Sequence, residues 1–130
     1  MSGAIPCFTF VAYSDTGKTT YIERLIAELK SRGVRVGTLK HDAHEFEIDK
    51  PGKDSWRFAR AGADVVAVAS ATKAAVMDYR AMDFAELVSR IKDVDVILVE
   101  GWHREGEKLI CLYRAASGKP LKLDPAQCAA

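Results

Sequence analysis

The amino-acid sequence predicts a three-layer α/β fold in which a mostly parallel sheet is accompanied by a separate strand pair. Residues 7–13 are rich in β-branched and aromatic side chains, and residues 34–39 form a second strand-like run. Between them, apolar residues recur at helical spacing, and Gly33 supplies a stop signal. Strand, helix and strand in this order form a βαβ unit, which requires parallel strands and a right-handed crossover.

The chain continues with a long loop and further α/β elements. Residues 41–53 are polar, lack periodicity and contain Pro51 and Gly52, and loops of this length are usually functional or disordered. The elements expected after it are a short helix capped by Asp54 that runs through Ala61 and ends at Gly62, strands at 65–69 and 74–79 that turn near 71–72, a helix starting at Asp83, and strands at 94–99 and 109–113. We expect one domain over residues 1–114 and a frayed or docking tail over 115–130.

The composition is that of an ordinary globular protein. The 130 residues carry 19 basic and 18 acidic side chains, a formal net charge of +1, which argues against nucleic-acid binding through bulk charge. The apolar stretch at residues 5–13 is too short to span a bilayer, so no membrane association is expected. Three cysteines without a C-x-x-C pair argue against a disulfide framework and favour the reducing cytoplasm.

Residues 12–19 carry the most informative motif. The run AYSDTGKT lies between a strand and a helix and matches the phosphate-binding P-loop pattern G-x-x-x-x-G-K-[ST], with Ala12 in place of the first glycine. In such a loop, backbone N–H groups surround phosphate oxygens, Lys18 reaches the outer phosphates and the Thr19 hydroxyl binds Mg²⁺. Gly17 allows a close approach of the backbone. The alternative is a chance match at a helix start, against which the flanking strand and helix argue.

Asp15 is an unusual residue for a phosphate-binding loop. A carboxylate about 4 Å from a phosphate would cost on the order of 4 kcal/mol at an effective dielectric constant near 20. The Asp15 side chain therefore either points away from the phosphate or weakens nucleotide binding. We expect Asp15→Gly to tighten nucleotide binding measured by calorimetry, and equal or poorer affinity would count against this interpretation.

Asp95 and Glu100 bracket a continuous apolar run, as in a Walker B segment. Ligands of parallel α/β sheets bind at the carboxyl ends of the strands, and at about 3.3 Å per residue the two acids lie roughly 17 Å apart. Glu100 can therefore reach a metal at the P-loop, whereas Asp95 is expected to be structural. The alternative for Glu100 is a solvated acid at a strand end, where Gly101 makes the turn.

By the same geometry, Lys40 and His41 leave the second strand at the ligand-binding edge and lead into the long loop. We interpret Lys40 as a phosphate partner and Asp49 as a metal ligand or water-positioning group. The alternative is a solvated, mobile loop. Trp102 follows Glu100 closely enough to lie at the rim of the site, although core or edge packing is the more ordinary role for such a residue and for Trp56.

Three segments together resemble the MobB family, the GTP-binding proteins of molybdopterin guanine dinucleotide biosynthesis. They are FVAYSDTGKTT, TLKHDAHEFEIDKPGKDSWRFARAGA and VDVILVEGW, of which the middle one is the most specific, and the resemblance covers residues 5–114. It implies a P-loop NTPase fold of the SIMIBI class, GTP and Mg²⁺ as cofactors, at most slow GTP hydrolysis, and a homodimer. It also implies a MobA-like molybdopterin guanylyltransferase and molybdopterin as partners.

The resemblance also implies roles by position. Thr19 and Glu100 would bind Mg²⁺, and Asp49 and Glu100 are the candidates for a catalytic role. The phosphate loop would consist of Ser14, Thr16, Gly17, Lys18, Thr19 and Thr20, and the middle motif of Lys40, His41, Asp49, Gly52 and Asp54. Asp15 lies within that loop as a further candidate for nucleotide binding, but it departs from the glycine or small residue usual in the family. Family members typically continue through a further segment that helps to recognise the base, which this chain is expected to lack, so the choice between GTP and ATP stays open.

Three functions are compatible with these patterns. The leading hypothesis is a GTP-binding accessory protein that assists GMP attachment to molybdopterin, without fast hydrolysis because a second catalytic acid and an arginine finger are not evident. The first alternative is a small P-loop kinase or a ligase similar to dethiobiotin synthetase, which would turn over about 1 to 10³ times per second once its acceptor is supplied. The second alternative is a docking module that binds neither GTP nor ATP.

Overall fold

A computed structural model describes residues 5–11, 17–41, 46–102 and 108–111. The chain divides into two compact units, one of residues 1–42 and 84–130 and one of residues 43–83. The second unit is thus an insertion in the first, a division that the sequence patterns do not indicate. The expected boundary at residue 114 falls outside the described residues and stays a prediction. None of the helices in the described ranges is long and apolar enough to cross a membrane.

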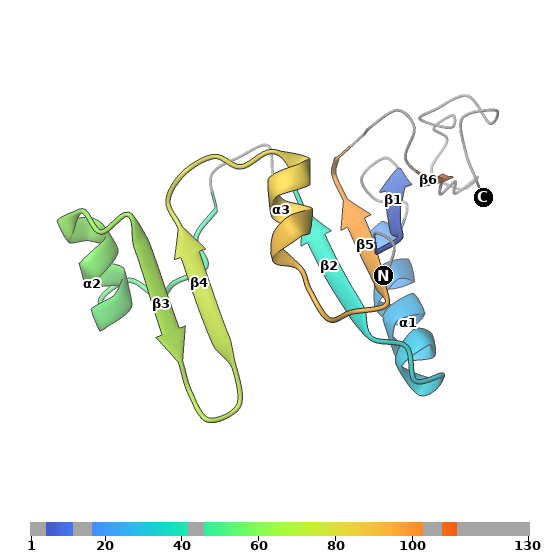
Figure 1. The fold of residues 1–130 in the computed structure, drawn as a ribbon, viewed down its shortest axis with the longest axis horizontal. Helices are drawn as coiled ribbons and strands as arrows, with labels where there is room; N and C mark the ends of the chain where they lie inside the picture. Colours follow the sequence, from blue (N-terminus) through green and yellow to red (C-terminus); the bar gives the residue numbers. More distant parts are fainter. Residues whose placement is uncertain (1–4, 12–16, 42–45, 103–107, 112–130) are drawn as a thin grey trace. The chain divides into compact units, whose positions relative to one another are not determined.

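The first unit is built on a four-stranded parallel sheet. Its strands are β1 (Cys7–Val11), β2 (Val36–Lys40), β5 (Val96–Glu100) and β6 (Lys108–Cys111), in the order β2-β5-β1-β6 (Figure 1). All three strand pairings are parallel. β1 and β2 of the predicted βαβ unit are parallel but not neighbours, because β5 lies between them. The carboxyl ends of the strands therefore meet at one edge, as the sequence predicts.

Two helices, α1 (Lys18–Ser31) and α3 (Phe84–Arg90), cover the two faces of this sheet. On one face, buried Phe10, Val96 and Leu98 pack against the apolar side chains of α1. On the other face, buried Leu39, Ile97 and Val99 pack with Phe84 and the apolar side chains of α3. These layers confirm the three-layer prediction, and they explain why β5 is apolar on both faces.

The second and fifth strands begin later than predicted, because the residues before them have other partners. The Val34 N–H donates to the Leu29 carbonyl oxygen at 3.0 Å and so belongs to the end of α1. The Arg35 N–H donates to the Asp95 carboxylate at 2.8 Å, and the Asp95 N–H donates back to the Arg35 carbonyl oxygen at 2.8 Å. Asp95 is therefore structural, as expected, and joins the amino ends of β2 and β5.

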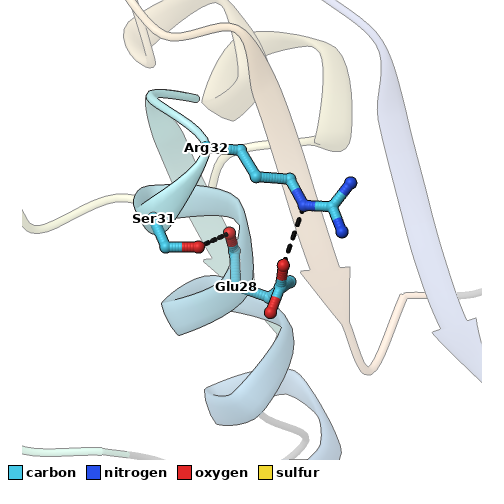
Figure 2. Close-up of polar contacts among 3 residues, drawn as sticks. All are labelled: Glu28, Ser31 and Arg32. Carbon is cyan, nitrogen blue, oxygen red and sulfur yellow. Dashed lines mark hydrogen bonds and ion pairs between the residues drawn. The ribbon is translucent and has the colours of Figure 1, made fainter.

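The two ends of α1 differ in how their polar groups are satisfied. At the carboxyl end, the Ser31 hydroxyl donates to the Glu28 carbonyl oxygen at 2.7 Å and the Arg32 Nε donates to the Glu28 carboxylate at 2.8 Å (Figure 2). At the amino end, the N-cap residue Gly17 has a left-handed conformation with φ 84° and no side chain that could cap the helix, and the first turn contains no acidic residue. The backbone N–H groups of that first turn are therefore left without a side-chain cap.

The second unit contains a helix and a strand pair at the predicted places. α2 (Asp54–Ala61) ends at Gly62, whose φ is 116°, and contacts β3 (Val65–Ala69). β4 (Ala74–Asp78) pairs with β3 in antiparallel orientation (Figure 1). Both the short helix and the separate strand pair of the sequence analysis are confirmed.

Cys111, the last residue of β6, is disulfide-bonded. The expectation that the cysteines form no disulfide is therefore wrong for this residue. An odd number of cysteines excludes complete pairing within one chain, but it leaves room for a single pair.

Candidate functional site

The ends of three strands form the edge of the sheet at which the site lies. In the register of the sheet, Glu100 at the end of β5 is paired with Phe10 of β1 on one side and with Lys40 of β2 on the other. Paired residues of neighbouring strands point to the same face. Because Phe10 packs among the side chains that α1 covers, Glu100 and Lys40 belong to the α1 face as well.

Lys18, the first residue of α1, forms an ion pair with Glu100 across this edge. The Lys18 Nζ lies 3.6 Å from the Glu100 Oε1, and the two side chains are 19% and 23% exposed. A partly shielded pair is screened less by water and salt than a pair on the open surface. The structure thus places Glu100 beside Lys18, and Asp95 at the opposite end of β5.

The donor set at this edge fits a phosphate group accompanied by Mg²⁺. Lys18 provides a cation for phosphate oxygens, and the uncapped N–H groups of the first α1 turn provide further donors. Glu100 provides a carboxylate oxygen, and Thr19 exposes a hydroxyl in the same turn. Within the described ranges no three His, Cys, Asp or Glu residues gather as a metal cluster. Mg²⁺ beside phosphates needs only one or two protein ligands, because water and phosphate complete its octahedron.

The chain segment after Glu100 is tied to the segment after Lys40. The His41 N–H donates to the Glu100 carbonyl oxygen at 2.9 Å. Gly101 has a left-handed conformation with φ 83°, and a Cβ at this position would collide with the His41 carbonyl oxygen. Glycine is thus required at position 101 both for the backbone conformation and for the close approach to His41.

An aromatic cluster lies at the same edge. The sequence analysis predicted only that Trp102 lies at the rim of the site, not its contacts with other rings. The Trp102 ring lies 4.7 Å from the His41 ring and 5.5 Å from the Phe84 ring, centroid to centroid, the latter in an edge-on arrangement. Trp102 also packs against the buried cluster of Leu39, Ile97 and Val99. The sequence signal that could have predicted this cluster is an aromatic residue just after Glu-Gly at the end of a strand, together with an aromatic residue at the start of a helix.

The other predicted site residues lie either outside the described residues or in the inserted unit. Ser14, Asp15 and Thr16 lie outside the described residues, so the conformation of the phosphate loop stays a prediction. Asp49, Gly52 and Asp54 belong to the inserted unit. There, one Asp49 carboxylate oxygen accepts from the Lys50 N–H at 3.0 Å, and the other is buried without a hydrogen-bond partner among the described residues. Whether Asp49 takes part in the site stays a prediction.

Trp56, the second tryptophan of the chain, lies in α2 of the inserted unit. The Arg60 guanidinium lies 5.1 Å from its ring centroid, one helical turn away. Such a contact covers the ring on the helix surface and supports the interpretation of Trp56 as an edge-packing residue.

Comparison with known proteins gives a consistent family match. The family model described as Molybdopterin guanine dinucleotide synthesis protein B, MobB, matches residues 7–129. The molybdopterin-guanine dinucleotide biosynthesis adapter protein of Escherichia coli is 42% identical over 120 residues, which cover 88% of this chain and 69% of that protein. The protein of the same name from Haemophilus influenzae is 38% identical over 130 residues, covering 93% and 70%.

Solved structures match over a similar part of the chain. A crystal structure of Bacillus subtilis MobB superposes with a TM-score of 0.71 at 31% sequence identity, covering 83% of this chain and 68% of that one. A crystal structure of molybdopterin-guanine biosynthesis protein B superposes with a TM-score of 0.63 at 32% identity, covering 80% and 66%. Sequence and fold therefore point to the same family.

Proposed function

This chain belongs to the MobB family, and on that premise we propose that it is an adapter of molybdopterin guanine dinucleotide biosynthesis that holds GTP with Mg²⁺ at the carboxyl edge of its parallel sheet. The Lys18–Glu100 ion pair carries this proposal. A phosphate group with its Mg²⁺ contains both an anion and a cation, so it can take the place of each partner of the pair. A triphosphate is thereby favoured over an uncharged or purely anionic ligand.

In the first unit, cationic and N–H groups would bind the phosphates, and oxygen ligands would bind Mg²⁺. Lys18 and the backbone N–H groups at the start of α1 would bind the outer phosphate oxygens. Thr19 and Glu100 would hold Mg²⁺, which neutralises phosphate charge when it is bound. Lys40 and His41 would flank the phosphates, since Lys40 is paired with Glu100 in the sheet and His41 follows it.

Asp49 of the inserted unit is the remaining candidate for a role in hydrolysis. Its second carboxylate oxygen, which has no hydrogen-bond partner among the described residues, has the chemistry to orient a water molecule. Glu100 cannot serve as the base at the same time as it holds the metal. We therefore propose slow GTP hydrolysis at most, which fits an adapter that presents a nucleotide to a partner enzyme.

A thermal-shift panel with GTP, ATP, GDP and ADP, each with and without Mg²⁺, tests the proposal. A ligand present at 100 times its Kd stabilises the folded state by about 2.7 kcal/mol, and we expect the largest shift for GTP with Mg²⁺. The panel also separates the alternatives. Absence of any shift would favour the docking module, and turnover near 1 per second with a phosphate acceptor would favour a kinase or ligase.

The proposed partners are a MobA-like guanylyltransferase, molybdopterin and a second copy of the chain. The exposed face of the β3–β4 pair supports the homodimer, because Val65 and Val76 on it are 52% and 63% exposed. A two-stranded sheet with an uncovered apolar face is marginal on its own. We expect Val76→Asp to shift the chain toward monomer in sedimentation velocity, whereas Thr72→Asp in the exposed β3–β4 turn leaves the oligomeric state unchanged.

A further inference from the structure

The inserted unit is joined to the first unit at two chain junctions. The chain leaves the first unit after residue 42 and returns at Phe84. On the first unit, the last described residue before the insertion is His41, directly after β2, and the first residue after it is Phe84, which begins α3. Any change at these two positions is passed covalently to the two ends of the insertion.

One side chain contacts both junctions. The Trp102 ring lies 4.7 Å from the His41 ring and 5.5 Å from the Phe84 ring, centroid to centroid. His41 and Phe84 flank the two ends of the insertion, and Trp102 follows later in the first unit. Trp102 thus fixes the departing and the returning segment to the same place on the first unit.

Trp102 is in turn rigidly linked to Glu100. Only Gly101 separates them, and its backbone is closely packed against His41, whose N–H donates to the Glu100 carbonyl oxygen at 2.9 Å. Glu100 cannot change its backbone position without moving either His41 or Trp102. Closely packed groups of this kind transmit small displacements instead of absorbing them.

We propose that Trp102 couples the occupancy of the Lys18–Glu100 site to the conformation of the inserted unit, residues 43–83. The proposal rests on the nucleotide-binding function proposed above. Glu100 would exchange its ion pair with Lys18 for Mg²⁺ when the nucleotide is bound. A resulting shift of the end of β5 would then reach both junctions through Trp102. The adapter thereby signals its loaded state through the insertion, while the phosphate groups remain bound on the first unit.

Hydrogen exchange measured by mass spectrometry on the full chain, with and without GTP and Mg²⁺, tests this coupling. In the wild type we expect protection of α2 and β3 amides to change at least about fivefold on binding, the lower end of ordinary coupling between sites. Trp102→Leu should abolish this response, and Trp102→Phe, which keeps a ring between His41 and Phe84, should retain most of it. GTP affinity is measured on the same samples by calorimetry.

The outcomes separate this inference from the proposed function. An unchanged response of the inserted unit in a folded Trp102→Leu chain, or no response in a wild type that binds GTP, would overturn the coupling and leave nucleotide binding intact. A wild type that binds no nucleotide would overturn the proposed function, and the coupling with it.

A fluorescence measurement covers the case in which Trp102→Leu does not fold. The chain contains two tryptophans, so Trp56→Phe leaves Trp102 as the only one. We expect the emission of Trp102 to change on addition of GTP and Mg²⁺, because its contact with His41 changes. Constant emission at saturating nucleotide would also overturn the coupling.

Discussion

The two units of the chain differ in how far they bury the valine residues of their strands. In the first unit, Val99 of β5 is 0% exposed and packs with Phe84 and the apolar side chains of α3. In the inserted unit, Val76 of β4 is 63% exposed and lies on the face of the strand pair opposite buried Val66. The first unit therefore contains its own core, whereas the second contains an apolar face that is open for a partner.

This difference in burial separates the candidate binding site, in the first unit, from the exposed apolar surface of the inserted unit. A binding site needs side chains held by packed neighbours, and Lys18 and Glu100 project from the packed sheet and its covering helix. The insertion has little core of its own, because it consists of a two-stranded sheet with one helix. Its exposed apolar face is the surface that we propose a second copy of the chain covers.

The largest expected difference in unfolding free energy is between the same substitution, valine to alanine, in the two sheets. Val99→Ala removes buried methyl groups and leaves a cavity, so we expect it to lower the free energy of unfolding by about 2–3 kcal/mol. Val76→Ala changes an exposed position and should cost no more than about 0.5 kcal/mol. Urea unfolding followed by circular dichroism at low protein concentration measures both. Equal losses at the two positions would contradict the contrast between the units.

A second contrast compares two glycines that share a left-handed conformation. Gly101 and Gly52 have φ values of 83° and 90°, but a Cβ collides with His41 only at Gly101 and meets nothing within 4 Å at Gly52. Gly52→Ala should therefore cost only the conformational penalty of about 1 kcal/mol, and Gly101→Ala about 3 kcal/mol. Thermal unfolding of the two variants side by side checks this, and a Gly101→Ala chain as stable as Gly52→Ala would show that the β5 end is not closely packed.

The smallest expected contrast is between the two candidate acids. Glu100→Gln removes the carboxylate next to Lys18 and should weaken Mg²⁺-dependent GTP binding at least about tenfold, or 1.4 kcal/mol. Asp49→Asn should change GTP affinity less than about threefold and instead lower the slow hydrolysis. Calorimetry and phosphate release measure the two effects, with Asp95→Asn at the far end of β5 as a control for binding. A tenfold loss of affinity in Asp49→Asn would move part of the binding site to the insertion.

The elements were predictable where local patterns and tertiary packing agree. The run from Asp54 to Gly62 contains its own start and stop signals, and the first four residues of β5 are apolar because both faces of the strand are covered. The starts of β2 and β5 were missed because Val34, Arg35 and Asp95 bond to partners that only the folded chain brings together.

The site was predictable in outline for a similar reason. The motif around Lys18 and the acid at the end of β5 are local, and the rule that ligands bind at carboxyl ends of parallel strands places them together. The contacts of Trp102 with His41 and Phe84 depend on the spatial order of β2, β5 and α3. No spacing along the sequence contains that information, and the same is true of the boundary of the inserted unit.

Calorimetric titration of GTP with Mg²⁺ into the wild type, Lys18→Met and Lys30→Met tests the central claim most directly. Both lysines belong to α1, but Lys18 pairs with Glu100 at its first turn and Lys30 lies exposed in its last turn. Loss of a charged hydrogen bond to phosphate costs about 1.5–3 kcal/mol, so Lys18→Met should weaken binding at least about tenfold while Lys30→Met binds as the wild type does. Equal affinity of Lys18→Met and wild type would contradict the assignment of this edge as the nucleotide site.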